Sequence, residues 1–105
     1  MAPVSGLNQS GDQKTELFDS RLKISPDVFF ETLEGRAVLL DSKHGLYFEL
    51  DPVGTRFWEL LNQLESPAEV FARMVHQVEV DPETLRADLI ELLAQLKNHK
   101  LIVPA

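Results

Sequence analysis

Histidines and carboxylates, the side chains that most often perform chemistry in proteins, are present in this sequence but scattered. His44, His76 and His99 lie far apart, and no two of them have the spacing of a local metal-ligand pair. The seventeen Asp and Glu residues are dispersed, and Asp51 and Asp81 stand before prolines, where they are interpreted as helix caps. The chain has no cysteine, so thiolate chemistry and cysteine-ligated zinc are excluded. We predict no catalytic residues and no metal site.

The short motifs of common enzyme classes are also missing from the sequence. It contains no GxSxG, no Walker A loop, no GxGxxG and no HExxH. The five glycines are isolated, as turn glycines usually are. We therefore predict a protein that is not an enzyme and needs no cofactor.

Length and charge narrow the class of partner. The 105 residues, 44% of them hydrophobic, suffice for one domain with one core. Ten Lys and Arg against seventeen Asp and Glu give a formal charge of −7, and the basic residues are scattered. Nucleic-acid binders usually carry a clustered positive excess because phosphate neutralisation supplies much of their affinity. The balance predicts a protein or peptide partner and no nucleic acid.

No targeting or membrane signal is recognisable. The longest apolar runs, such as AVLL, are far below the roughly 20 residues of a membrane span. The first residues, MAPVSGLNQSGDQ, lack the basic start and apolar segment of a secretory signal. The expectation is a cytoplasmic location without a membrane partner.

The first twenty residues differ in composition from the rest. Residues 1–20 combine Gly, Ser, Gln, Asn and Asp with isolated Leu7, Leu17 and Phe18. Such a segment buries too little apolar surface to offset its ordering entropy. The prediction is a flexible tail over 1–20 and one domain over 21–105. The alternative is that Leu17 and Phe18 dock onto the domain or a partner.

Three runs of β-forming residues follow, separated by turn signals. Residues 28–33 and 36–41 are joined by Glu34-Gly35, and a second turn ending in Gly45 leads to residues 46–50. The pattern predicts a three-stranded antiparallel meander. Because residues 46–50 end the meander, they form a candidate edge strand with unpaired backbone donors and acceptors.

Alternation assigns the side chains of these strands to two faces. Tyr47 and Glu49 are expected to point away from the core. The residues expected to point into it are Val38, Leu40, Leu46, Phe48 and Leu50.

Three helices are predicted after the meander. Each begins at a capping residue followed by proline at the first helical position, in Asp51-Pro52, Ser66-Pro67 and Asp81-Pro82. The first helix carries Trp58 on an apolar stripe, where it is interpreted as a core residue. Gly54 costs about 1 kcal/mol of helix propensity relative to Ala, which indicates close approach of a neighbouring element.

The last of these helices has two different shoulders beside its leucine stripe. At 100° per residue, one shoulder is mixed apolar and basic and consists of Arg86, Ile90, Leu93, Ala94 and Lys97. The opposite shoulder, which contains Asp88, Glu91 and Gln95, is polar. The mixed shoulder could line a groove, and the alternative is that it is only the partly exposed border of the core.

The order of elements predicts an α+β fold of the winged helix-turn-helix kind, a three-stranded antiparallel sheet followed by three helices. Residues 28–103 resemble a PqqD-type domain, the recognition element that binds leader segments of ribosomally made, later modified precursor peptides (a RiPP recognition element). The resemblance rests on AVLLDSKHGLYFELDPVGTRFWELL and VDPETLRADLIELLAQLKNHKLI. Lys100 departs from the family pattern, because many relatives carry glycine there.

The resemblance implies a noncatalytic adaptor. In that family the leader peptide adds as a strand to the third strand and packs against the third helix, a form of β-augmentation. Carried over to this sequence, the peptide-binding residues are Leu46, Tyr47, Phe48, Glu49, Leu50, Arg86, Ile90, Leu93 and Lys97. Arg86 and Lys97 would then meet an acidic leader.

The partners implied are a precursor peptide and a modifying enzyme such as a protease, a cyclase or a radical S-adenosylmethionine enzyme. The product class, whether lasso peptide, quinone cofactor or thioether peptide, stays open. Two alternatives from other classes also stay open. One is a winged-helix DNA-binding regulator, and the other is a structural subunit whose edge strand pairs with a second copy to form a homodimer.

Overall fold

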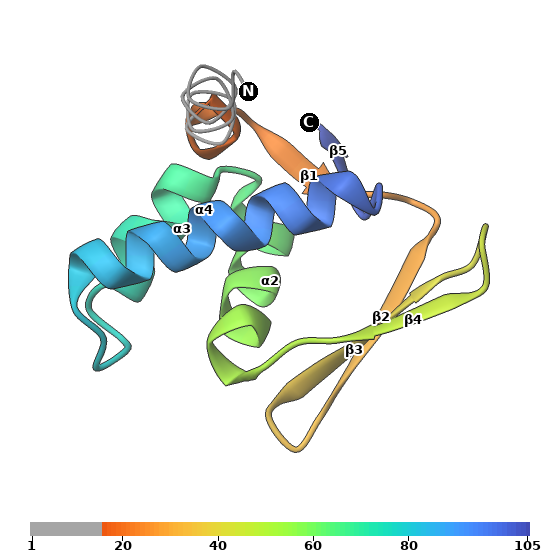
Figure 1. The fold of residues 1–105 in the computed structure, drawn as a ribbon, viewed down its shortest axis with the longest axis horizontal. Helices are drawn as coiled ribbons and strands as arrows, with labels where there is room; N and C mark the ends of the chain where they lie inside the picture. The colour runs from red at the N-terminus through yellow and green to blue at the C-terminus, as the bar shows by residue number, and fades with distance from the viewer. Residues whose placement is uncertain (1–15) are drawn as a thin grey trace, which may run out of the picture.

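The computed structural model describes residues 16–105 and has a mixed α+β architecture (Figure 1). Its strands are β1 (Leu22–Ile24), β2 (Val28–Leu33), β3 (Arg36–Asp41), β4 (Leu46–Glu49) and β5 (Ile102–Pro104). Its longer helices are α2 (Pro52–Leu64), α3 (Pro67–Met74) and α4 (Pro82–Asn98), and residues 16–19 form a helical turn before β1. Within this part of the chain, no helix has the length and apolar character needed to cross a membrane.

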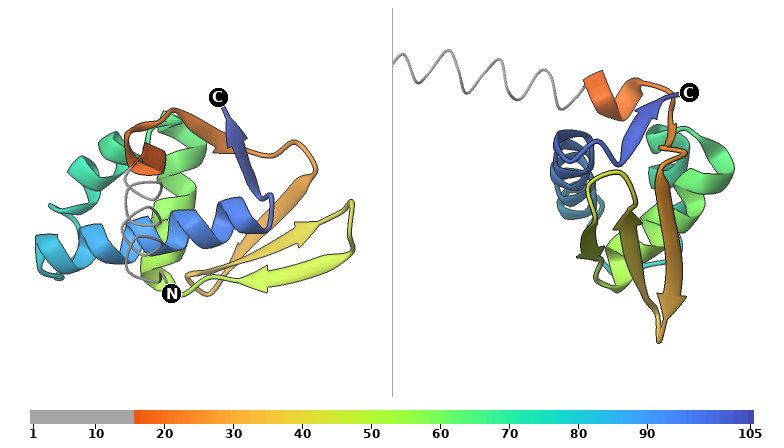
Figure 2. Two further views of the ribbon diagram at one scale, coloured as in Figure 1. Left: turned by 45° about the horizontal axis from the view of Figure 1, so that its top comes forward. Right: turned by 90° about the vertical axis from the view of Figure 1, so that its right-hand side faces the viewer.

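The strands form two separate sheets. The larger is antiparallel in the order β2-β3-β4, so the predicted three-stranded sheet followed by three helices is confirmed. The smaller joins β1 to β5 and was not predicted: Leu22 faces Pro104 and Ile24 faces Ile102. Figures 1 and 2 show β1 and β5 side by side, which ties the start of the domain to its end.

The predicted turns of the larger sheet are confirmed by their backbone angles. Glu34 and Gly35 join β2 to β3 with φ values of 53° and 78°, and positive φ at both central residues is what a type I′ turn requires. Gly45 ends the turn between β3 and β4 with φ 69°. Both turns therefore use the left-handed region that glycine enters without steric cost.

The three helix starts are formed by the predicted caps. The Asp51 carboxylate accepts a hydrogen bond from the Gly54 N–H at 2.7 Å, and the Ser66 hydroxyl accepts one from the Glu69 N–H at 3.3 Å. The Asp81 carboxylate accepts from the backbone N–H groups of residues 83 and 84. Each capping residue satisfies donors that a helix leaves free in its first turn.

The chain leaves α4 through a left-handed turn at Lys100. Lys100 has φ 59°. The Lys100 N–H donates to the Lys97 carbonyl and the Leu101 N–H donates to the Leu96 carbonyl, both at 2.9 Å, which is the Schellman pattern. Leu101 and Leu96 are both buried and belong to the same hydrophobic core.

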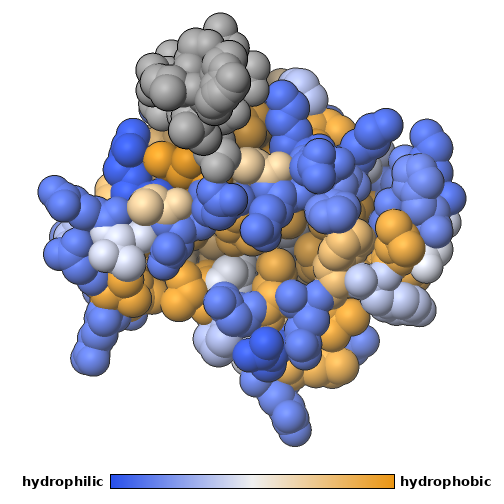
Figure 3. Space-filling view, viewed as in Figure 1, coloured by the Kyte–Doolittle hydropathy of each residue, from blue (hydrophilic) through white to orange (hydrophobic). Residues whose placement is uncertain are grey.

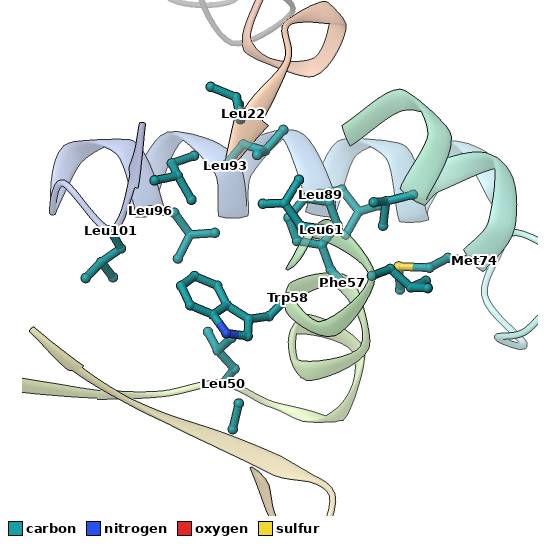
Figure 4. Close-up of a cluster of buried hydrophobic side chains, with 14 of the residues drawn as sticks. Leu22, Leu50, Phe57, Trp58, Leu61, Met74, Leu89, Leu93, Leu96 and Leu101 are labelled. Carbon is teal, nitrogen blue, oxygen red and sulfur yellow. The ribbon is translucent and has the colours of Figure 1, made fainter. Parts of the chain in front are cut away.

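One core lies between the helices and the larger sheet (Figure 4). Its largest fully buried side chains include Phe57 and Trp58 of α2, so the interpretation of Trp58 as a core residue is confirmed. The Trp58 ring meets the Phe30 ring edge-to-face, with centroids 5.5 Å apart. Its indole Nε1 finds no hydrogen-bond acceptor among the described residues.

The prediction that Val38 and Leu40 of β3 point into the core was wrong. Ala37 and Leu39 are fully buried, whereas Val38 and Leu40 are only half-buried and lie on the outer face. Every residue of the run from 37 to 40 is apolar, so alternation alone could not identify the core face. Register decided it, because Leu39 pairs with Phe48 and therefore shares its face.

The prediction that Leu46 points into the core was also wrong. It lies on the same face of β4 as Phe48 and Leu50, yet its side chain is 50% exposed. Leu46 pairs with Asp41 at the turn end of the hairpin, and Figure 1 shows this end projecting away from the helices. Phe48 is half-buried against the core and Leu50 is buried, as predicted.

The predicted flexible tail over residues 1–20 does not extend to Leu17 and Phe18. These two residues pack onto the domain, as the alternative proposed. Phe18 is only 5% exposed, and its ring meets the Phe71 ring edge-to-face at 5.7 Å between centroids. Leu17 is half-buried and packs against the core. The rest of the predicted tail, residues 1–15, lies outside the described residues.

Candidate functional site

The outer edge of β4 carries unpaired backbone groups. In the sheet order β2-β3-β4, only β3 pairs with β4 within the described chain. The Leu50 N–H donates to the Ala37 carbonyl on β3 at 2.9 Å. Because hydrogen-bonding direction alternates along an antiparallel strand, the N–H and C=O groups of Tyr47 and Glu49 point to the free edge. This edge can accept a further strand.

The side chains beside this edge differ on its two faces. Tyr47, 70% exposed, and Glu49 lie on the outer face, as predicted. The Glu49 carboxylate lies 3.4 Å from Nε of Arg36, which begins the neighbouring strand β3. On the inner face, Phe48 contacts the ring of His99 just beyond α4, with centroids 4.8 Å apart. The sequence did not relate His99 to β4, because the two are far apart in the chain and no local signal connects them.

A hollow of about 470 Å³ lies between the end of β4, the start of α2 and one side of α4. Its apolar lining comes from Leu50, Val53, Val80, Leu89 and Leu92. Figure 3 looks onto this side of the molecule, and apolar surface is visible between the polar side chains of α4 and those of the hairpin. In the right-hand view of Figure 2, α4 lies over the β4 side of the sheet, away from β2.

Gly54 brings α2 close to α4 at the base of this hollow. A Cβ atom placed on Gly54 would lie 3.6 Å from Cδ2 of Leu92 and 3.1 Å from the capping oxygen of Asp51. The predicted close approach of a neighbouring element is therefore confirmed, and that element is α4. An added Cβ would press on the Asp51 cap, whereas it would meet Leu92 of α4 at an ordinary van der Waals distance.

The side of α4 that faces the hollow is the polar shoulder, with Asp88, Glu91 and Gln95 in its lining. This differs from the expectation, because Arg86, Ile90 and Lys97 are absent from that lining. The Arg86 guanidinium instead lies 4.8 Å from the centroid of the Phe18 ring. The two shoulders flank the same leucine stripe, so periodicity could not say which of them faces the sheet.

Leu93, another residue of α4 that was predicted to bind the peptide, lies in the core. Its side chain is fully buried in the core, where Figure 4 shows it among the packed leucines. With 0% of its surface exposed, Leu93 presents no surface to a peptide in this structure. Ile90 is half-buried and packs against the same core.

The hollow is acidic. Its lining includes four carboxylates, from Glu49, Asp51, Asp88 and Glu91. No Lys or Arg side chain of the described residues belongs to the lining. Arg86 and Lys97, the basic residues expected to meet an acidic leader, therefore do not line this hollow.

A hydrogen bond between His44 and Asp41 stabilises the turn between β3 and β4. Nδ1 of His44 lies 2.7 Å from Oδ2 of Asp41, and Oδ1 of Asp41 accepts from the backbone N–H groups of Lys43 and His44. The side-chain hydrogen bond from His44 is the main reason that the pKa of Asp41 lies below its ordinary value. Within residues 16–105, no group of three or more potential ligands could hold a metal ion.

Comparisons with known proteins agree with this fold. The family model described as "Coenzyme PQQ synthesis protein D (PqqD)" matches residues 36–102. A search of curated protein sequences gives no match.

Two solved structures are similar to this chain. "TbiB1 in Complex with the TbiA(beta) Leader Peptide" is 36% identical, covers 76% of this chain and 93% of its own, and has a TM-score of 0.71. "Lasso peptide synthetase B1 complexed with the leader peptide" is 24% identical, covers 81% and 100% respectively, and has the same TM-score, so it supports the fold alone. The family match spans more than half of the chain, and the chain therefore belongs to the PqqD family.

Proposed function

We propose that this protein is a noncatalytic adaptor that binds the leader segment of a ribosomally synthesised precursor peptide as an added strand on β4. The observation that carries the proposal is the free edge at Tyr47 and Glu49 beside a partly apolar hollow. The relative TbiB1, 36% identical, was solved in complex with a leader peptide, which supports the same class of ligand here.

The geometry divides affinity and specificity between two parts of the site. Backbone hydrogen bonds to Tyr47 and Glu49 hold a peptide of any sequence in an extended conformation. Alternate side chains of that peptide turn toward α4 and enter the hollow, where Leu50, Val53 and Leu92 offer apolar contacts. The side chains between them lie on the outer face, beside the exposed Tyr47 ring.

An adaptor of this kind leaves the modified part of the precursor free. Holding the leader raises the effective concentration of the remaining peptide at a second protein. That second protein would be a modifying enzyme, such as a protease, a cyclase or a radical S-adenosylmethionine enzyme. Because ribosomes supply the precursor, we place the encounter in the cytoplasm.

The test is a titration of isotope-labelled protein followed by NMR. The two probes are the TbiA(beta) leader peptide and the leader half of a short precursor encoded beside the gene of this chain. We expect chemical-shift changes in residues 46–50 and along the 88–95 face of α4. Binding whose shifts avoid both regions, or binding of neither probe, would reject the proposal.

The same sample can test the homodimer alternative. A second copy pairing along β4 would make the shifts of residues 46–50 depend on protein concentration without any peptide. Sedimentation over the same concentration range would show the larger species. We expect neither effect at the concentrations used for the titration.

A further inference from the structure

We propose that the peptide bound at β4 carries a Lys or Arg side chain that enters the hollow and pairs with Asp88. This inference rests on the proposed function and deepens it by naming the charge of the ligand. It follows from which of the four carboxylates of the hollow already have hydrogen-bond or ion-pair partners in the structure.

Three of these carboxylates already have partners. Asp51 caps α2 through the Gly54 N–H at 2.7 Å. Glu49 lies 3.4 Å from Nε of Arg36. Glu91 also takes part in an interaction. The Asp88 side chain, which is exposed on the α4 wall, makes no hydrogen bond or ion pair within residues 16–105. Asp88 is therefore the carboxylate that is available to a ligand.

The arrangement of apolar and acidic groups fits a long cationic side chain. The Lys and Arg side chains bury their aliphatic stems on apolar surface while the charged end stays near water. Here Leu92 and Val53 provide the apolar surface, and Asp88 stands on the α4 wall beside them. A short polar side chain would fill the apolar part poorly.

The charge balance of the hollow also disfavours an acidic side chain. A peptide carboxylate placed there would join four protein carboxylates and meet no Lys or Arg of the described lining. Like charges brought together in this way weaken binding and select against the wrong partner. Among the described residues no cation joins this lining, so a Lys or Arg of the peptide would complete the site.

The experiment uses a displayed library of random 12-residue peptides, selected on the whole protein. Selected peptides should share a Lys or Arg at one position. Replacing that residue with Glu in a synthetic copy should weaken binding by about fivefold, the size expected for one partly exposed ion pair. The Asp88→Lys variant should prefer the Glu version of the peptide.

A matched variant separates the site from overall charge. Glu31→Lys makes the same change in net charge on β2, and Glu31 is exposed and lies outside the lining of the hollow. It should keep the preference for the cationic peptide. If Glu31→Lys loses that preference to the same extent as Asp88→Lys, long-range attraction explains the selection and the Asp88 pair is rejected.

The outcomes also separate this inference from the function on which it rests. Peptides that shift the NMR signals of residues 46–50 but show no charge preference would overturn the Asp88 pair and leave peptide binding intact. Selected peptides that leave residues 46–50 unshifted, or a library from which nothing binds, would overturn both.

Discussion

Lys100 is a residue whose type conflicts with its backbone conformation. Its φ of 59° lies in the left-handed region, which costs a residue with a Cβ atom about 1 to 2 kcal/mol. Lys100→Gly should therefore raise the free energy of unfolding by about 1 kcal/mol. The gain stays at the lower end of that range because glycine also has more entropy in the unfolded chain, which offsets part of it. Urea denaturation measures the change. Lys100→Ala keeps the Cβ atom and should gain nothing, and an equal gain from both variants would contradict the explanation.

Asp41 should make the protein sensitive to acid. Its pKa in the folded state is lowered, chiefly by the His44 side chain, so the unfolded chain takes up a proton first as the pH falls. The stabilisation is complete above the ordinary aspartate pKa of about 3.9 and is lost as the pH drops through the lowered value. Urea midpoints of Asp41→Asn and the natural protein should therefore differ more at neutral pH than near pH 3. A constant difference would contradict this account.

At the scale of elements, the free edge of β4 is the feature on which peptide addition depends. The Tyr47 N–H points away from β3, so Tyr47→Pro removes a donor from the free edge without removing a hydrogen bond of the β3–β4 ladder. It should weaken peptide binding by roughly tenfold, which corresponds to about one hydrogen bond. Calorimetric titration with a peptide that binds the natural protein measures the loss.

The control for this change is Tyr47→Ala, which removes the exposed ring and keeps the backbone N–H. It should lose less affinity than Tyr47→Pro. Amide hydrogen exchange in β3 should stay protected in both variants, which shows that the sheet is intact. Equal losses would mean that the Tyr47 ring, and not the strand edge, holds the peptide.

At the scale of the whole molecule, the segment before β1 is part of the packed structure. Phe18 is buried against Phe71 on one side, and Arg86 of α4 lies over its ring. Phe18→Ala should lower the free energy of unfolding by roughly 3 kcal/mol, the usual loss for a buried aromatic side chain. Thermal or urea denaturation tests this. A loss close to zero would contradict the packing of Phe18 onto the domain and would support a flexible tail that includes residues 16–20.

Arg86 connects that segment to α4, and this predicts a separation of stability from binding. Arg86→Glu removes the cation from the Phe18 ring, a contact of about 1 kcal/mol at an exposed position. The variant should lose about that much stability and keep its peptide affinity, because Arg86 is outside the lining of the hollow. A large loss of affinity in a folded Arg86→Glu protein would place the peptide on the opposite shoulder of α4.

The elements of this fold could be predicted because their signals are local. Asp51, Ser66 and Asp81 each act within a few residues, and the turn at Glu34-Gly35 requires only its own backbone angles. The sheet order followed from short connections between neighbouring strands. The pairing of β1 with β5 could not be predicted in this way, because the two strands lie at opposite ends of the domain.

For the candidate site, too, local features could be predicted and long-range packing could not. By itself, the sequence determined that residues 46–50 form a strand at the end of the meander and that α4 has a basic and an acidic shoulder. Only the tertiary structure decided that the acidic shoulder, with Asp88, faces the hollow beside β4. The physical reason is that helical periodicity fixes which residues share a face, whereas the neighbour of each face depends on how the helix packs against distant parts of the chain.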